Sequence, residues 1–174
     1  ESSTLGPFRV QQTDIVGPVI GEELQRKGIY ATLTALVGIM IYIALRFRFS
    51  FAVGAIVATL HDLLITIVFL TWFGYDLSLN IIAALLTITG YSVNDTIVVF
   101  DRVRENLRSH RRDRLDEVVN KSVNDTLSRT VITAGTTFLA VLGLYLFGGE
   151  VLEGFAFTML VGIVAGTYST VFIA

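Results

Sequence analysis

Long apolar runs separated by short polar segments dominate this chain of 174 residues. Five of these runs are each long enough to cross the roughly 30 Å hydrocarbon layer of a bilayer as an α-helix. They cover about residues 28–45, 51–73, 77–100, 130–147 and 155–174. The pattern predicts an all-α membrane protein whose five transmembrane helices form a bundle. We interpret the polar residues 1–28 as the end of an extramembrane domain and the entry to the first span.

Composition supports this class. A mean hydropathy of +0.68 with 53% hydrophobic residues is too apolar for an ordinary soluble domain of this size. The chain contains no cysteine, which excludes a disulfide framework, a thiolate nucleophile and a cysteine-based metal site.

The charged residues between the spans predict an orientation. Arg46 and Arg48 follow the first span, and the long segment 101–129 is rich in arginine. The opposite side of the membrane would carry acids, namely Asp76, Glu150 and Glu153. The positive-inside rule makes the arginine-rich side cytoplasmic and the N-terminal tail extracytoplasmic. We therefore expect a further helix upstream, with six helices in the complete unit.

Segment 101–129 is predicted to be a basic cytoplasmic loop. Within it Leu115, Val118, Val119 and Val123 recur at helical spacing, which indicates an amphipathic surface helix leading into the fourth span. Acids alternate with the arginines, so topology marking explains the loop better than nucleic-acid binding does. The pentapeptide SVNDT occurs at 92–96 and again at 122–126. We interpret the second copy as a coincidence and Asp125 as a surface charge.

Asp95 is the main candidate for function. It lies about two helical turns inside Arg102, within the third span. A charged side chain at such a depth costs roughly 2.5–3.5 kcal/mol on insertion scales. Acids inside a membrane commonly mark a proton or ion pathway. Ala84, Tyr91, Asp95 and Arg102 share one helix face, and the small Ala84 would let a neighbouring helix approach.

Arg129 is the candidate partner of Asp95 because it heads the fourth span. Its helix face continues as a stripe of hydroxyls and small residues, namely Thr133, Thr136, Ala140 and Gly143, with Thr137 beside them. If this stripe packs against Asp95, the two helices form a polar lane suited to a proton relay. The alternative is an ion pair that only locks the two helices together.

His61 and Asp62 are adjacent in the second span, and their side chains point about 100° apart, so they form no metal-binding edge. They could carry protons, or they could form hydrogen bonds to neighbouring helices, and the sequence leaves both interpretations open. Gly162 and Gly166 predict close helix packing in the last span. The accessory polar candidates for the pathway are His61, Asp62, Tyr91, Asn94, Thr133 and Thr137.

Residues 90–106, GYSVNDTIVVFDRVREN, resemble the signature of the SecF family, whose members work with SecD in bacterial protein export. Further shared motifs are His61-Asp62, TLSRT at 126–130, VGP at 16–18 and GEEL at 21–24. The resemblance implies helices two to six of a six-helix half of the resistance-nodulation-division type, preceded by part of a periplasmic domain. It places Asp95 and Arg129 in a proton pathway, to which SecD adds a further acid.

The resemblance also implies the function and its setting. Proton flow across the bacterial inner membrane would drive late steps of protein translocation, with SecD, the SecYEG translocon, the emerging polypeptide and membrane lipids as partners. Protons would be the coupling ion, and we expect no other cofactor, no metal, no bound nucleic acid and no enzymatic activity. The chain has no P-loop motif for ATP. The alternatives are a proton-driven exporter of lipid or drug, a structural scaffold subunit, and an intramembrane aspartyl protease, which would need a second catalytic acid.

Overall fold

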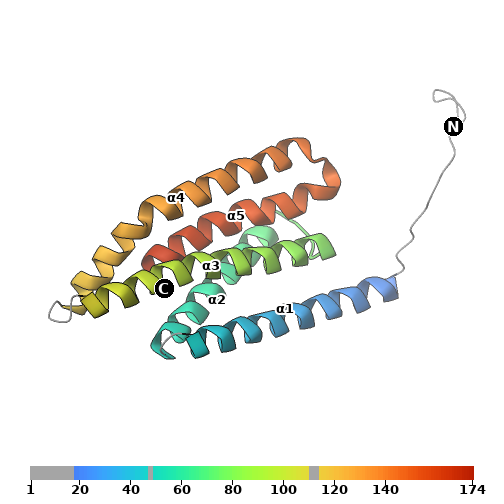
Figure 1. Cartoon of the computed structure of the whole chain (residues 1–174). Coiled ribbons are helices and arrows are strands. Elements are labelled where there is room, and N and C mark those ends of the chain that lie inside the picture. The colour runs from blue at the N-terminus through green and yellow to red at the C-terminus, as the bar shows by residue number, and fades with distance from the viewer. Residues whose placement is uncertain (1–17, 47–48, 110–113) are drawn as a thin grey trace, which may run out of the picture.

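The computed structural model describes residues 18–46, 49–109 and 114–174. These residues form a bundle of five α-helices, each long and apolar enough to cross a membrane (Figure 1). The helices are α1 (Pro18–Arg46), α2 (Phe49–Trp72), α3 (Leu79–Ser109), α4 (Leu115–Phe147) and α5 (Glu150–Phe172). The predicted all-α bundle of five spans is confirmed.

The helices extend further than the apolar runs that predicted them. α3 continues beyond Phe100 to Ser109, and α4 begins at Leu115 rather than near Thr130. Most of segment 101–129 is therefore helical. The predicted helix through Leu115 and Val123 is confirmed as the first part of α4, whereas residues 101–109 continue α3 instead of forming a loop. The reason is that apolar runs mark only the part of a helix that crosses the hydrocarbon, whereas backbone hydrogen bonds also form outside it.

The N-terminal tail is only partly described. α1 begins at Pro18, where the fixed φ of proline suits the first turn of a helix, so the helix starts well before the predicted span. Residues 1–17 of the predicted tail and Arg48 lie outside the described residues.

α3 is the central helix of the bundle. It packs against α1, α2, α4 and α5, whereas α1 contacts only α2 and α3 among the described helices. Figure 1 shows α3 between α1 on one side and the antiparallel pair α4 and α5 on the other. Asp95 therefore lies on the helix that contacts all the other described helices. A shift of α3 would change the packing of each of them.

α3 and α5 approach closely at two glycines. A β-carbon added at Gly162 would come within 2.6 Å of Ile88, and one added at Gly166 would come within 3.2 Å of Ser92. Van der Waals contact requires more room than this, so only glycine fits at position 162 without a shift of Ile88. The close packing predicted from the glycine spacing is confirmed.

Tyr75 links the α2–α3 turn to α5 at one end of the bundle. Its hydroxyl donates a hydrogen bond of 2.7 Å to Glu153 Oε1. Its ring stacks on Phe157, with 4.8 Å between the ring centroids. Burial raises the pKa of Tyr75 above its ordinary value of 10.0, and the hydrogen bond to Glu153 raises it further. Gly149, whose φ of 74° suits glycine, makes the turn into α5.

Candidate functional site

Asp95 of α3 is hydrogen-bonded to Thr130 of α4. The Thr130 hydroxyl Oγ1 donates to Asp95 Oδ1 over 2.9 Å. Thr130 is only 3% exposed, and Asp95 is half-buried. The two helices are thus joined at the carboxylate that the sequence identified, and one side of that carboxylate stays open.

Arg129, the predicted partner of Asp95, lies close enough for its charge to act on that carboxylate, but it makes no ion pair with it among the described residues. Arg129 lies next to Thr130, but adjacent helical residues point about 100° apart, and Arg129 is exposed. Within the single chain, Asp95 thus has a hydrogen-bond partner in Thr130 and a more distant cation in Arg129.

The stripe that Arg129 heads faces outward. Thr133, Thr136 and Ala140 are exposed, so the prediction that this face packs against Asp95 within the chain is wrong. The buried face of α4 lies one residue further round and comprises Val118, Ser122, Thr126, Thr130, Ala134 and Val141. The predicted contact face was off by one residue because it was drawn from Arg129, whereas the small and hydroxyl residues beside Arg129 are the ones that pack against α3 and α5.

Some of the accessory candidates on α3 and α4 are half-buried inside the bundle, and others are exposed on its surface. Tyr91 and Thr137 are half-buried, and Tyr91 packs against the core cluster that includes Ile88 and Ala134. Asn94 is exposed on α3 and Thr133 is exposed on α4. The hydroxyls of Thr136 and Thr137 donate to carbonyls of their own helix, at 2.9 and 2.8 Å. Thr137 is also hydrogen-bonded to Tyr91 of α3, so these two accessory candidates join the same pair of helices as Asp95 and Thr130.

Asp62 is the most deeply buried acid of the described residues, with 1% of its surface exposed. Its Oδ2 accepts a hydrogen bond of 2.5 Å from Ser92 Oγ of α3, and its Oδ1 lies 3.2 Å from His61 Nδ1. A β-carbon added at Gly166 of α5 would come within 3.6 Å of the same carboxylate. Asp62 therefore sits where α2, α3 and α5 meet, and both of its oxygens have a partner.

Hydroxyl groups extend this polar contact between α2, α3 and α5. Thr96 and Thr170 form a hydrogen bond of 3.3 Å between α3 and α5, and both are almost fully buried. Thr66 and Thr89 are also buried, and each donates to a carbonyl of its own helix. The sequence left open whether Asp62 bonds to nearby helices, and the structure shows that it does so through Ser92.

A second polar contact, which the sequence missed, joins the far ends of α3 and α4. Arg102 donates from Nε and Nη2 to Asp125 Oδ2 over 3.0 and 2.9 Å. Asn106 Nδ2 donates to the buried Ser122 Oγ over 2.9 Å. Asp125 is exposed, as its interpretation as a surface charge predicted, and it is also a specific partner of Arg102, which the sequence did not predict. The repeated SVNDT was the available signal, because both copies place a buried serine and a buried threonine one turn apart.

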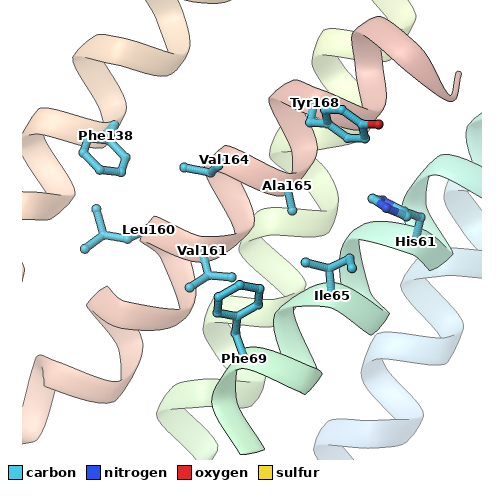
Figure 2. Close-up of a pocket in the computed structure, with 9 residues that line it drawn as sticks. All are labelled: His61, Ile65, Phe69, Phe138, Leu160, Val161, Val164, Ala165 and Tyr168. Carbon is cyan, nitrogen blue, oxygen red and sulfur yellow. The ribbon is translucent and has the colours of Figure 1, made fainter. Parts of the chain in front are cut away.

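An apolar groove opens beside His61. It has a volume of about 530 Å³ and lies between α2 and α5, with Phe138 of α4 at one end. Figure 2 shows the rings of His61 and Tyr168 together at the other end, and their centroids are 6.2 Å apart. Among the described residues no group of three His, Asp or Glu side chains is placed to hold a metal ion.

These observations define a class: a multi-pass helical membrane protein with ionisable and hydroxyl groups buried between its spans. Residues 2–174 match the family described as "Protein export membrane protein SecD/SecF, C-terminal". The chain belongs to this SecD/SecF family, as the signature at 90–106 predicted.

Relatives agree with this assignment. The chain is 53% identical over 171 residues to the protein translocase subunit SecF of Rhodothermus marinus, covering 95% of this chain and 56% of that protein. It is 49% identical over 167 residues to the SecF subunit of Koribacter versatilis, covering 96% of this chain and 41% of that protein. The chain thus spans about half the length of the curated relatives it matches.

Solved structures show the same fold. A crystal structure of SecDF from Thermus thermophilus, described as a translocon-associated membrane protein, matches with a TM-score of 0.86 and 49% identity. The match covers 91% of this chain and 22% of that one. A second SecDF structure, described as a super-membrane-facing form, matches with a TM-score of 0.83 and 48% identity over 90% of this chain and 21% of that chain.

Proposed function

We propose that the chain is the membrane domain of a SecF-type subunit, which couples proton movement across the bacterial inner membrane to protein export. The observation that carries this proposal is the Asp95–Thr130 hydrogen bond of 2.9 Å on the central helix. It places a titratable group inside a span, at the contact between two helices. Family membership supplies the transport setting.

Protonation of Asp95 would change both its charge and its hydrogen bonding. The ionised carboxylate can only accept, so Thr130 must donate to it, whereas the protonated acid also carries a donor. Neutralising the group also removes the cost of a charge within the span. Because α3 contacts all the other described helices, a change in the α3–α4 contact would be transmitted to the whole bundle.

The energy available is sufficient for such a shift. One elementary charge crossing a potential of 100 mV releases about 2.3 kcal/mol. A free energy of that size biases a two-state packing equilibrium by more than about tenfold. The proton is then an adequate coupling ion without ATP or another cofactor.

A SecD-type subunit is the proposed partner at the open side of Asp95. The exposed residues Asn94, Arg129 and Thr133 lie within helices that are apolar enough to span the membrane. Polar side chains in lipid require a protein neighbour or a water-filled cavity. A facing subunit would cover this surface and bring a further acid to Asp95 and Arg129, while SecYEG and the emerging polypeptide would be bound by other parts of the complete protein.

The orientation follows the charges. The end of α3 that carries Arg102, Arg104 and Arg108 would be cytoplasmic together with the start of α4, and the Tyr75–Glu153 end would face outward. The family comprises translocase subunits, so we propose a transport role without catalysis of a chemical reaction.

Asp95→Asn tests the proposal, because it removes the titrating charge and keeps the size. We expect normal insertion and complex formation, with loss of the part of export that depends on the proton gradient. The control is Asp76→Asn in the exposed turn between α2 and α3. Export at the wild-type rate in Asp95→Asn would refute the proposed coupling, and loss of drug or lipid efflux with normal protein export would favour a different transporter.

A further inference from the structure

A pocket of about 480 Å³ lies between the ends of α1 and α3. Three arginines line it, together with two acids and a serine: Arg46, Arg104, Arg108, Asp101, Glu105 and Ser109. Arg46 is the last residue of α1, and the other five belong to the last three turns of α3. Nothing in the proposed proton coupling uses this pocket.

The balance of charge in the pocket favours an anion. Glu105 is paired with Arg102, which is not a lining residue and whose Nη1 lies 2.7 Å from Glu105 Oε2. Asp101 is shared with Arg46 across a long contact of 3.8 Å. Arg104 and Arg108 have no acid in contact among the described residues. They stand four residues apart, so they project from one face of α3 and can reach the same ligand.

The pocket lies at the edge of the apolar layer. Ile43 and Phe100, which are 1% and 3% exposed, belong to one core cluster and lie directly before the charged ends of their helices. Leu45, beside Arg46, is 84% exposed, as a lipid-facing side chain would be. Guanidinium groups at this depth meet lipid phosphates, and basic pockets between spans on the cytoplasmic side bind anionic headgroups.

An apolar groove gives the ligand a second attachment. It has a volume of about 240 Å³ and is lined by α1, α2 and Val93 of α3. Its α1 residues run from Leu33 to Ile43, so it ends about one turn from Arg46. A free phosphate would use only the arginines, whereas a phospholipid would also place an acyl chain along this groove.

We propose that this pocket binds the phosphate headgroup of an anionic phospholipid, held mainly by Arg104 and Arg108, with its acyl chain along α1. The site would fix α1, which contacts only α2 and α3 among the described helices, to the central helix. It lies at the end of α3 and needs neither Asp95 nor Thr130, so it stands independently of the proposed function.

Native mass spectrometry of the full-length protein tests the proposal. The probes are phosphatidylglycerol, zwitterionic phosphatidylethanolamine and free glycerol phosphate. We expect the protein to retain bound phosphatidylglycerol and to bind phosphatidylethanolamine and glycerol phosphate more weakly. The double variant Arg104→Gln/Arg108→Gln should bind phosphatidylglycerol about 30-fold more weakly, because each arginine near a headgroup contributes roughly fivefold.

Matched variants separate this site from general charge effects. Arg114→Gln/Lys121→Gln removes the same charge at the start of α4, outside the pocket, and should keep wild-type binding. Asp101→Asn removes an acid from the lining and should strengthen phosphatidylglycerol binding several-fold, an increase that misfolding would not produce. Unchanged binding in the Arg104/Arg108 variant overturns the proposal, and equal binding of glycerol phosphate would make the pocket a site for soluble anions instead.

Discussion

Ser92 of α3 donates a hydrogen bond of 2.5 Å to Asp62 of α2, about one helical turn before Asp95 on the chain's central helix. The bond lies in the packed interior, since Asp62 and Ser92 are only 1% and 2% exposed. A carboxylate buried so fully is stable only when its oxygens are hydrogen-bonded. Asp62 therefore fixes the position of the helix segment that carries the proposed proton group.

Removing the Asp62 carboxylate should destabilise the bundle. In Asp62→Ala, the buried Ser92 hydroxyl loses its acceptor, and we expect the free energy of unfolding in detergent to fall by about 1–3 kcal/mol. Ser92→Ala leaves the carboxylate without its donor and should cost a similar amount. Asp76→Ala, in the exposed turn after α2, should change stability by less than about 0.5 kcal/mol. Equal stability of Asp62→Ala and Asp76→Ala would contradict the structural role of this bond.

Thr130→Val tests the partner of Asp95. Valine keeps the shape of threonine without its hydroxyl, so the carboxylate loses a hydrogen bond that is worth about 1.5–3 kcal/mol when an ionised group takes part. We expect export that depends on the proton gradient to fall several-fold, measured with a reporter precursor in membrane vesicles. Thr136→Val is the matched control, because the hydrogen bonds of that hydroxyl go to the Ile132 and Thr133 carbonyls of its own helix. Identical export by the two variants would show that Thr130 has no part in coupling.

Glycine substitutions should have opposite effects on different helices. Gly162→Ala places a methyl group 2.6 Å from Ile88, and the resulting overlap should destabilise the protein by about 1–3 kcal/mol. Gly135→Ala, where nothing lies within 4 Å, should stabilise α4 by about 1 kcal/mol through helix propensity. Thermal unfolding in detergent measures both. Adding Ile88→Val to Gly162→Ala removes one of the crowded atoms and should restore part of the lost stability; failure of that rescue would argue against the close α3–α5 contact.

The pH dependence of stability should report on Tyr75. Its raised pKa means that the folded protein holds the phenolic proton more tightly than the unfolded chain does. Stability is then lost as the pH rises above about 10, the ordinary value for tyrosine. In Tyr75→Phe this loss should be less steep between pH 10 and 11, measured by the unfolding midpoint. Glu153→Gln keeps the phenol and should give an intermediate profile; a slope for Tyr75→Phe as steep as that of the wild type would refute the assignment.

Much of the fold was predictable because the bilayer constrains it. A span needs about 20 apolar residues, so the five runs located the helices. The helical spacing from Leu115 to Val123 indicated the start of α4, whereas the polar end of α3 beyond Phe100 carries no apolar signal. The glycine pair at 162 and 166 was equally legible, because small residues four apart allow close approach. Family membership was also predicted, from residues 90–106 together with the shorter motifs elsewhere in the chain, and it is confirmed.

By itself the sequence determined which residues share a helix face and how deep Asp95 lies in its span, since both follow from a helix's fixed rise and turn. Only the tertiary structure decided which neighbour each face meets. The orientation of α4 about its axis brings Thr130, the residue after Arg129, into hydrogen-bond contact with Asp95. The crossing of α2 and α3 brings Asp62 into hydrogen-bond contact with Ser92. Those choices depend on how side chains of several helices fill the space between them, which no single helix encodes.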